Sequence, residues 1–472
     1  MKPPRFDPSP RIIRTGGNLY YATNSSYLHE PDFSAQRPYR FAFLLYFLLF
    51  LVILYFLFSR HAHLTFLLLS IIFLAEVSLR CALLYFGLRR SKQIRNMTNF
   101  PPPKNEDLPT YTLLLPLLDE RGMLDQQYKA ICGLDYPMRL LDVKLIIEEN
   151  DEQLIESAIQ IQTHAPFAMD VMIVPKYGLL TKARACNYAL KEASGELITI
   201  FDAEDIPDPG QLKRVATGFI IMGDDVGCLQ ASLLSHEWND LFFANQFAIE
   251  YEMLFEYLLP SLTRHQLPFP LGGTSNHLRT TLLQEIGGWD AWNVTEDADL
   301  GFRLAIAGYS VRSLYSYTLE KPPHNFTIWV QQRSRWFKGY MQLWMVQMQR
   351  PKKFYKDVGF GGFMIFHFMV LKTFLSPLLH LILFLIVLLM TWGDAAPMSL
   401  VAGIICVTSY VILLIIYILG CRRRDDSWLL YSGIFLQPFY WCLSIFAFMI
   451  AMGDLLFRPY HWHKTPHIAD KK

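Results

Sequence analysis

The stretch between residues 295 and 339 guides the interpretation of the whole chain, because its two ends differ in chemistry. It begins with the acidic sequence Thr295-Glu296-Asp297 and ends with an aromatic and cationic cluster, Gln331-Gln332-Arg333-Ser334-Arg335-Trp336-Phe337-Lys338-Gly339. Apolar runs long enough to cross a bilayer lie on both sides of the region that contains it. This arrangement indicates chemistry at a membrane surface.

The bulk composition agrees with a membrane protein of more than one domain. The chain has 472 residues, of which 52% are hydrophobic, and its formal net charge is +1. Such a balanced charge gives no argument for nucleic acid as a partner. The seven cysteines are scattered without a CxxC pair, so we expect neither a disulfide framework nor a zinc site.

The N-terminal part predicts a cytoplasmic segment followed by a transmembrane hairpin. Residues 1–39 are rich in Pro, Ser and Arg without a clear period, which favours irregular structure. Phe41–Phe58 and Leu64–Gly87 are each about long enough to span a hydrocarbon core of roughly 30 Å. We expect a tight turn at residues 59–63, which makes residues 40–88 a hairpin.

Two charged residues lie within the predicted hairpin, and a basic run follows it. Glu76 and Arg80 stand four apart on one helix face. They are either a charge pair that faces a neighbouring helix or the lining of a polar path through the membrane. The basic residues after position 87 favour the cytoplasm. We therefore expect an integral protein of the cell (inner) membrane whose following domain is cytoplasmic.

Residues 105–350 have the alternating pattern of an α/β domain. The predicted strands are Tyr111–Leu118, Val143–Ile147, Val171–Val174 and Leu197–Phe201, and the predicted helices are Arg121–Leu134, Glu152–Thr163 and Thr181–Ala193. This alternation predicts a mostly parallel sheet, whose ligands bind beyond the carboxyl ends of the strands. Acidic clusters follow the strands there: Asp119-Glu120, Glu148-Glu149-Asn150-Asp151 and Asp202-Ala203-Glu204-Asp205.

After residue 350 the chain becomes apolar again. We interpret residues 358–457 as an interfacial helix (about 358–370), spans at about 373–391 and 399–419, and an ambiguous segment, Trp428–Phe457. That last segment is either one spanning helix or a pair of helices broken near Pro438. Residues 458–472 form a basic tail, whose charge favours the second interpretation because it keeps the tail inside.

Two acidic motifs carry candidate chemistry. Asp202 and Glu204 follow an apolar strand, and two carboxylates at this spacing suit Mg²⁺ or Mn²⁺, which commonly bridges protein carboxylates to phosphate. A solvated acidic loop would look the same. Glu296-Asp297 precedes a predicted helix start, where acids also stabilise the helix dipole. A carboxylate there could act as a general base for a sugar hydroxyl.

Three further patterns are candidate binding elements. Gln332 and Arg335 can hold diphosphate oxygens and Trp336 offers a flat face to a sugar ring, although an interfacial helix has the same composition. Lys182 and Arg184 lie on a predicted helix, either as phosphate contacts or as solvated cations. The Gly-rich turn that contains Gly273, Thr274, Ser275 and Asn276 lacks P-loop spacing, and its backbone could approach a sugar.

Together these motifs resemble glycosyltransferase family 2, specifically the membrane-integrated processive synthases of cellulose, hyaluronan and chitin. Four ordered elements carry the resemblance: acids after the early strands, Asp202-Ala203-Glu204, Thr295-Glu296-Asp297, and Gln332-Arg333-Ser334-Arg335-Trp336, which is the QxxRW pattern. The resemblance implies a GT-A-type nucleotide-sugar domain inserted between transmembrane and interfacial helices. It covers about residues 111–350 by motif and the apolar segments by architecture.

The resemblance also implies roles for individual residues. Asp297 would be the catalytic base of an inverting displacement, with Glu296 beside it. The donor would be held by Glu120, Glu149 or Asp151, Lys182, Arg184, Asp202, Gln332 and Arg335. The metal ligands would be Asp202 and Glu204, with Mg²⁺ or Mn²⁺. The acceptor would meet Trp336 and the turn formed by Gly273, Thr274, Ser275 and Asn276.

Three functions fit these expectations. The first is a metal-dependent synthase that moves sugar from a nucleotide sugar, such as a UDP-sugar, to a growing β-linked polysaccharide and passes it through the membrane. The second is a single transfer to a lipid-linked acceptor, and the third a non-catalytic membrane assembly subunit. An accessory export or regulatory subunit is a further expected partner. The motif departs from DxD because Glu204 replaces the second Asp, which bears on metal preference.

Overall fold

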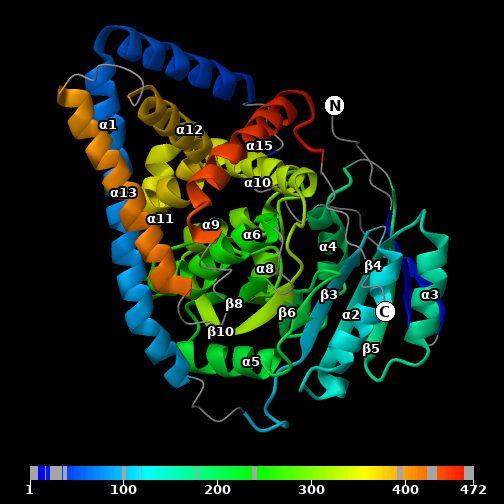
Figure 1. Cartoon of the computed structure of the whole chain (residues 1–472). Coiled ribbons are helices and arrows are strands. Elements are labelled where there is room, and N and C mark those ends of the chain that lie inside the picture. Colours follow the sequence, from blue (N-terminus) through cyan, green and yellow to red (C-terminus); the bar gives the residue numbers. More distant parts are fainter. Residues whose placement is uncertain are drawn as a thin grey trace.

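The computed structural model describes residues 9–15, 17–21, 34–35, 40–97, 103–118, 120–176, 179–235, 242–390, 397–421 and 433–461. A ten-stranded sheet forms the centre of the α/β domain, with the order β2-β1-β5-β4-β3-β6-β9-β8-β10-β7 (Figure 1). Its strands are β1 (Arg11–Arg14), β2 (Asn18–Tyr21), β3 (Tyr111–Leu117), β4 (Leu141–Glu148), β5 (Ala168–Val174), β6 (Leu197–Ile200), β7 (Ile206–Pro207), β8 (Val226–Ser235), β9 (Asn276–Arg279) and β10 (Ser310–Glu320).

The sheet is mixed, whereas the sequence predicted a mostly parallel one. Strands β5, β4, β3 and β6 pair in parallel, as expected for βαβ units, and β8 pairs in parallel with β10. Strand β9 lies between β6 and β8 and is antiparallel to both. The difference arises because β9 follows the Gly-rich turn at residues 272–275 and re-enters the sheet in the opposite direction.

Helices cover both faces of the sheet. They are α2 (Leu124–Cys132), α3 (Glu152–Gln162), α4 (Lys182–Lys191), α5 (Gln211–Met222), α6 (Phe242–Tyr251), α7 (Leu259–Arg264), α8 (Thr280–Glu285) and α9 (Glu296–Ile306). Successive strand residues point to opposite faces. Leu113 and Leu145 therefore pack with α2, α3 and α5, and Leu114 and Ile146 pack with α4. Both faces are buried, which explains why the predicted strands are continuous apolar runs.

The N-terminal segment, which we expected to be mostly irregular, contains a β-hairpin with strands at Arg11–Arg14 and Asn18–Tyr21. Strand β1 pairs antiparallel with both β2 and β5 and so extends the sheet. Gly17 has φ of 77°, and its N–H donates to the carbonyl of Arg14. The Gly-Gly pair between two short β-prone runs is a hairpin signal that was missed.

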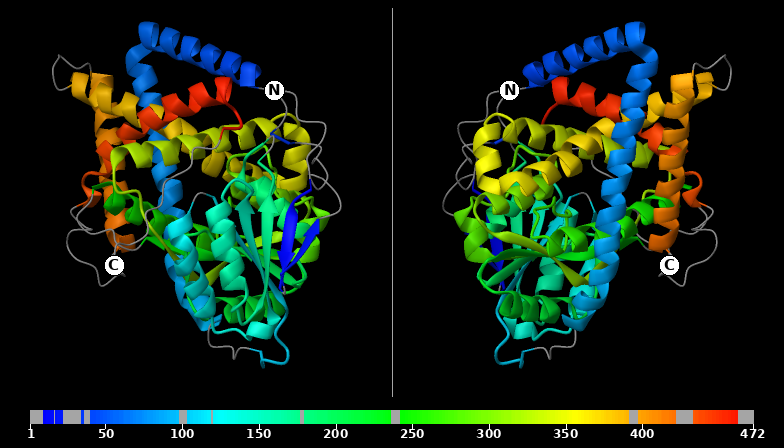
Figure 2. Two further views of the ribbon diagram at one scale, coloured as in Figure 1. Left: turned by 90° about the vertical axis from the view of Figure 1, so that its right-hand side faces the viewer. Right: turned by 90° about the vertical axis from the view of Figure 1, so that its left-hand side faces the viewer.

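The helices outside the sheet are α1 (Arg40–Met97), α10 (Phe326–Gln347), α11 (Pro351–Phe366), α12 (Lys372–Met390), α13 (Pro397–Cys421) and α15 (Gln437–Phe457). In α1 only His61 leaves helical geometry, so a single kink replaces the predicted tight turn. The two arms of α1 meet at a sharp angle instead of lying side by side as a hairpin (Figure 1). Figure 2 shows the second arm running beside α13 and down past the sheet.

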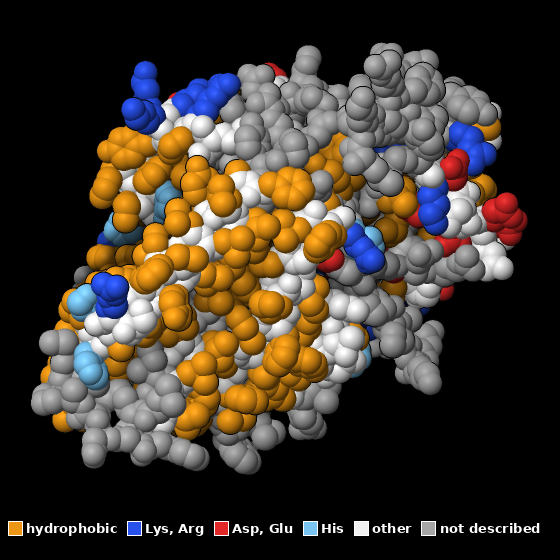
Figure 3. Space-filling view, turned by 90° about the horizontal axis from the view of Figure 1, so that it is seen from above, with side chains coloured by type: hydrophobic (Ala, Val, Ile, Leu, Met, Phe, Trp, Pro, Cys, Tyr) orange, Lys and Arg blue, Asp and Glu red, His pale blue; other side chains and the backbone are white. Residues whose placement is uncertain are grey.

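Within the described residues, four helical segments are long and apolar enough to cross a membrane: Phe41–Gly87, Pro351–Leu385, Leu400–Gly420 and Gln437–Phe457. The first arm of α1 exposes large side chains such as Phe41, Leu45 and Tyr46. Seen from above, hydrophobic side chains form a broad patch on this face (Figure 3). Such a surface is typical of contact with lipid. These helices support membrane association.

The C-terminal helices differ from the expected division in two places. A π-helical segment, His367–Leu371 (η4), joins α11 to α12. Helix α15 begins at Gln437 with Pro438 in its first turn, and a turn at residues 435–436 precedes it, so the described residues 433–457 are not one continuous helix. The arginine run at residues 422–424 and the tail from residue 462 lie outside the described residues.

Candidate active site

A cavity of about 420 Å³ is lined both by the carboxyl edge of the sheet and by helices α1, α10, α12, α13 and α15. It therefore contains residues from the acidic motifs, from the aromatic and cationic cluster, and from the apolar helices. The predicted site residues that line it are Glu120, Lys182, Arg184, Asp202, Glu204, Gly273, Glu296, Asp297, Gln332, Arg335 and Trp336. The remaining predicted residues, Glu149, Asp151, Thr274, Ser275 and Asn276, are not among its lining.

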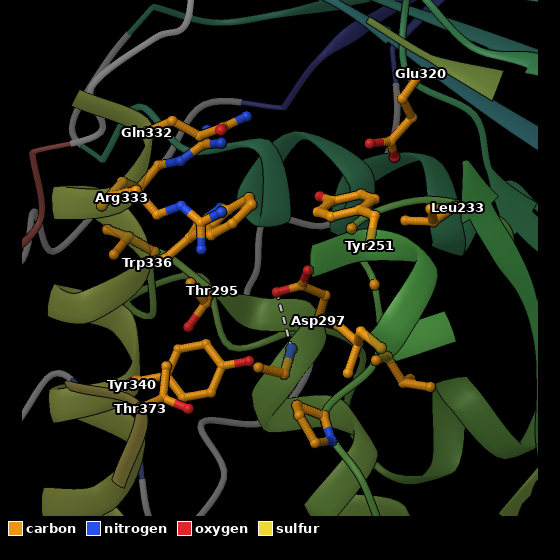
Figure 4. A pocket seen from close by; sticks show the side chains of 18 of the residues that line it. Leu233, Tyr251, Thr295, Asp297, Glu320, Gln332, Arg333, Trp336, Tyr340 and Thr373 are labelled. Atoms are coloured by element: carbon orange, nitrogen blue, oxygen red, sulfur yellow. Dashed lines mark hydrogen bonds between the residues drawn. The ribbon is translucent and has the colours of Figure 1, made fainter. Parts of the chain in front are cut away.

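Asp297 lies at the centre of this cavity, between α10 side chains and Tyr251 (Figure 4). It is in the first turn of α9, where its Oδ1 accepts the N–H of Ala298 at 2.8 Å. A Cβ atom added to Gly273 would lie 3.3 Å from Oδ2 of Asp297. The absence of a side chain at Gly273 thus leaves this carboxylate room beside the Gly-rich turn.

The carboxylates of Glu296 and Asp297 hold their protons more tightly than usual. Burial raises the pKa of Asp297, against the attraction of Lys182 and Arg335. Burial and then the charge of Asp297 raise the pKa of Glu296 to about 7. The charge of Asp297 thus disfavours ionisation of the neighbouring Glu296. An ionised carboxylate can accept a proton from a nearby hydroxyl group.

A close contact between α10 and the start of α9 fixes where Asp297 lies. Thr295 is buried and packs directly against Gly339 of α10. A Cβ atom at position 339 would overlap the side chain of Thr295. The glycine therefore allows the two helices to approach, and it ties the acidic motif to the aromatic and cationic cluster.

Asp202 and Asp205 have different surroundings. The Nζ of Lys182 lies 2.5 Å from Oδ1 of Asp202 and donates to the carbonyl of Gly273 at 2.8 Å. Burial opposes the charge of Lys182, but Asp202 and Glu296 outweigh it and raise its pKa. Asp205 is buried and accepts the N–H of Asp202 and the hydroxyl of Thr274, so it holds the turn together.

The donor set for a metal consists of carboxylates that repel one another. Burial and the charges of Asp202 and Glu120 raise the pKa of Glu204 well above its ordinary value. A divalent cation would relieve this repulsion, and oxygen ligands suit Mg²⁺ or Mn²⁺. Among the described residues, no three His, Cys, Asp or Glu side chains form a metal-binding group. To hold a metal, Asp202 and Glu204 would therefore need further oxygen ligands, such as those of a phosphate group.

The rest of the Gly-rich turn supports the site from behind. Thr274, Ser275 and Asn276 are buried, and Oγ1 of Thr274 lies 2.9 Å from the carbonyl oxygen of Ile200. The Asn276 amide donates to the carbonyl of Gly272 at 2.7 Å. These contacts hold the backbone of Gly273 against Asp297 and Lys182. The structure does not bring the three side chains into the cavity.

The acids after β4 divide in a similar way. Glu148 lines the cavity, whereas Glu149 is exposed and accepts the N–H of Lys176 at 2.8 Å. Asp151 is buried and caps α3 by accepting the N–H of Leu154. Arg184 lines the cavity but also donates to the carbonyl of Pro175 at 3.1 Å. Asp119 lies outside the described residues.

Helix α10 presents the aromatic and cationic cluster to the cavity. Within the described residues, the amide oxygen of Gln332 is buried without a hydrogen-bond partner, as expected for a group that meets a ligand. The guanidinium of Arg333 lies 4.7 Å from the centroid of the Trp336 ring and pairs with Glu250. The ring of Tyr251 lies 6.3 Å from that of Trp336 and nearly parallel to it. These contacts with Arg333 and Tyr251 hold the Trp336 ring in place.

The sequence interpretation missed Glu250, Tyr251 and Glu320, all of which line the cavity. Glu320 ends β10, and burial and the charge of Asp202 raise its pKa to about 8. The sequence could have indicated Glu320, because it is an acid at the carboxyl end of a β-prone run. Glu250 and Tyr251 end α6, and nothing local distinguishes them from ordinary helix residues.

Residues 109–339 match the family described as glycosyltransferase like family 2. This part of the chain is a glycosyltransferase family 2 domain. The mixed sheet with its acidic edge agrees with the GT-A type of fold that the motifs implied. The match covers all four motifs that the sequence interpretation used.

Similar proteins include a probable glycosyltransferase, YdaM, of Bacillus subtilis (strain 168), 22% identical over 50% of this chain and 56% of the relative. A probable glucomannan 4-beta-mannosyltransferase 9 of Oryza sativa subsp. japonica is 23% identical over 60% of this chain and 55% of its own. The chain spans about half the length of these curated relatives. A solved mannosyltransferase of Pyrobaculum calidifontis, in complex with GDP-Man and Mn²⁺, covers 82% of this chain and 99% of its own at 16% identity and a TM-score of 0.48.

Proposed function

We propose that the protein is a membrane glycosyltransferase that moves a sugar from a nucleotide sugar to a hydroxyl group of an acceptor. The observation that carries the proposal is that Asp297 shares one cavity with Asp202, Gln332, Arg335 and Trp336. In this proposal Asp297 would be the base, Asp202 a ligand of a metal–diphosphate, Gln332 and Arg335 donors to phosphate oxygens, and Trp336 a surface for a sugar ring. The family match of residues 109–339 supports the same reaction class.

Asp297 is the base in this mechanism. Its carboxylate takes the proton of the acceptor hydroxyl while that oxygen bonds to the anomeric carbon of the donor sugar. The bond between the anomeric carbon and the diphosphate breaks, and the nucleoside diphosphate leaves with the electron pair. Attack from the opposite face inverts the configuration, so an α-linked donor gives a β-linked product.

The donor diphosphate lies between the acidic edge and α10 in this proposal. Arg335 and Gln332 donate hydrogen bonds to its oxygens. Asp202 and Glu204 would hold Mg²⁺ or Mn²⁺, which would neutralise charge on the departing diphosphate. Lys182, which pairs with Asp202, would also neutralise part of the charge on the diphosphate.

The sugar and the number of transfers are further parts of the proposal. A UDP-sugar is one donor to test, and GDP-mannose is another because the Oryza sativa relative is named a probable glucomannan mannosyltransferase. The extension of the cavity among the helices supports elongation of a β-linked polysaccharide, with passage of the product toward the membrane. The charged residues Arg80 and Lys372 in that extension favour a second form, in which the acceptor is lipid-linked.

The test uses the purified full chain in lipid nanodiscs with Mg²⁺ or Mn²⁺. A panel of UDP-sugars and GDP-mannose is supplied with and without a lipid-linked acceptor, and nucleotide release and product size are recorded. Release with a long product supports the synthase, and release with a single added sugar supports transfer to the lipid. Failure of every donor, with and without acceptor, would contradict the proposed activity and leave the non-catalytic assembly subunit.

A further inference from the structure

Three charged side chains meet where the cavity passes among the apolar helices. Oε1 of Glu76 lies 2.8 Å from Nε of Arg80, on the same helix, and 2.8 Å from Nζ of Lys372, the first residue of α12. Arg80 also donates to the hydroxyl of Tyr417 on α13 at 3.2 Å. Arg80 and Lys372 line the cavity, and the carboxylate that joins them does not. The cations are therefore the part of the cluster that a ligand would meet.

This cluster has an excess of positive charge. Glu76 carries one negative charge against the two positive charges of Arg80 and Lys372. The other charged groups nearby, Arg333 and Glu250, pair with each other and cancel. His380, which faces the same part of the cavity, bonds to the hydroxyl of Tyr410. Uncompensated charge on helices of this apolar character is costly, and such charges commonly mark a binding site.

The walls around the cations are apolar and are built partly by unusual backbone. Leu84, Phe368 and Leu413 line the same part of the cavity. Two π-helical segments, Glu252–Leu258 (η3) and η4, contribute further lining residues. π-Helical turns are rare and are frequent at functional sites. The surroundings thus favour a ligand that has both an anionic group and an apolar chain.

We propose that Arg80 and Lys372 bind the phosphate group of a lipid-linked acceptor. The inference rests on the proposed glycosyltransferase function, because the sugar end of that acceptor would extend along the cavity toward Asp297. Guanidinium and ammonium groups donate charge-assisted hydrogen bonds to phosphate oxygens. The lipid chain would lie among helices that are apolar enough to cross a membrane. A soluble phosphate has no apolar part to contact these walls, and a neutral glycan has no charge to pair with the cations.

The test measures binding to the full-length protein without any donor. The ligands are farnesyl phosphate, farnesol and inorganic phosphate, and the readout is the dissociation constant of each. We expect farnesyl phosphate to bind about tenfold more tightly than farnesol, since it adds hydrogen bonds to two charged groups. Inorganic phosphate should bind more weakly than farnesyl phosphate because it lacks the chain.

A series of charge variants separates a binding site from a structural ion pair. Lys372→Gln and Arg80→Gln each remove the excess charge, and they should abolish the preference for the phosphate. Glu76→Gln increases the excess, so it should strengthen that preference. Glu76→Gln combined with Lys372→Gln restores a net charge of +1, so the double variant should recover part of the preference for farnesyl phosphate over farnesol. Lys353→Gln, at an exposed position of α11 outside the cavity, is the matched control and should change nothing.

Several results would overturn the proposal. One is that farnesol binds as tightly as farnesyl phosphate. Another is that inorganic phosphate binds as tightly as farnesyl phosphate. If Glu76→Gln weakens the binding of farnesyl phosphate as much as Lys372→Gln does, the cluster only holds the helices together. Binding of an acidic oligosaccharide in place of farnesyl phosphate would assign the site to a glycan. Because no donor is present, the phosphate preference can hold even if the proposed transfer fails, and the reverse also applies.

Discussion

The two ends of the cavity carry opposite charge. At the carboxyl edge of the sheet, Asp202, Glu204, Glu296, Asp297 and Glu320 outnumber the cations, and several of their pKa values are raised. Among the apolar helices, one carboxylate faces two cations. The first end is thus suited to a metal and to proton transfer, and the second to an anionic group. A single cavity can therefore orient a substrate by its charge.

The largest expected effect belongs to the acidic end. Asp297→Asn should lower turnover at least about a hundredfold, because a general base contributes that much or more. Donor affinity should change little, since the base acts in the transition state. The measurement is nucleotide release beside direct donor binding, with the exposed Asp224→Asn as the control. Binding of farnesyl phosphate should also be unchanged, and a large loss there would mean that the two ends do not act separately.

A smaller effect is expected where the two ends join. Gly339→Ala would push Thr295 and the start of α9 away from α10. Overpacking of this kind costs about 1–3 kcal/mol of stability. Misplacement of the base should also reduce kcat roughly tenfold or more. Thermal unfolding and kcat should be compared with those of Gly453→Ala, whose added Cβ meets nothing within 4 Å. Equal behaviour of the two variants would contradict the close contact.

The smallest expected effect is a change in pH dependence. The base must be ionised to act, so kcat/KM should fall as the pH falls through the raised pKa values of Glu296 and Asp297. Glu296→Gln removes a neighbouring negative charge, which makes ionisation of Asp297 easier and should move the acidic limb to lower pH. The exposed Glu285→Gln is the control. A shift to higher pH would contradict repulsion between the two carboxylates.

Local signals predicted the elements that hold the acidic end. An apolar strand before Asp202, a turn before Glu296 and a helix that carries Gln332 and Trp336 are all found as expected. Each of these depends on neighbouring residues in the sequence: strand propensity, turn glycines and helix periodicity. The roles of these residues remain predictions.

The sequence could not predict features that depend on distant parts of the chain. The pairing of Lys182 with Asp202 and the meeting of Glu76 with Lys372 arise only when separate elements pack together. The pair at Glu76 and Arg80 was expected, but its third member was not. The role of Asp151 as a helix cap was equally hidden, because an acid before a helix fits a ligand contact as well as a cap.

The N-terminal hairpin has a consequence for the order of assembly. Ile12 pairs with Met172, and the whole of α1 lies between them in the sequence. During synthesis, β1 therefore waits for β5 to leave the ribosome, by which time α1 has long emerged. Strand β1 can therefore join the sheet only after the whole of α1 has been synthesised. Completion of the sheet thus always follows the synthesis of this long apolar helix.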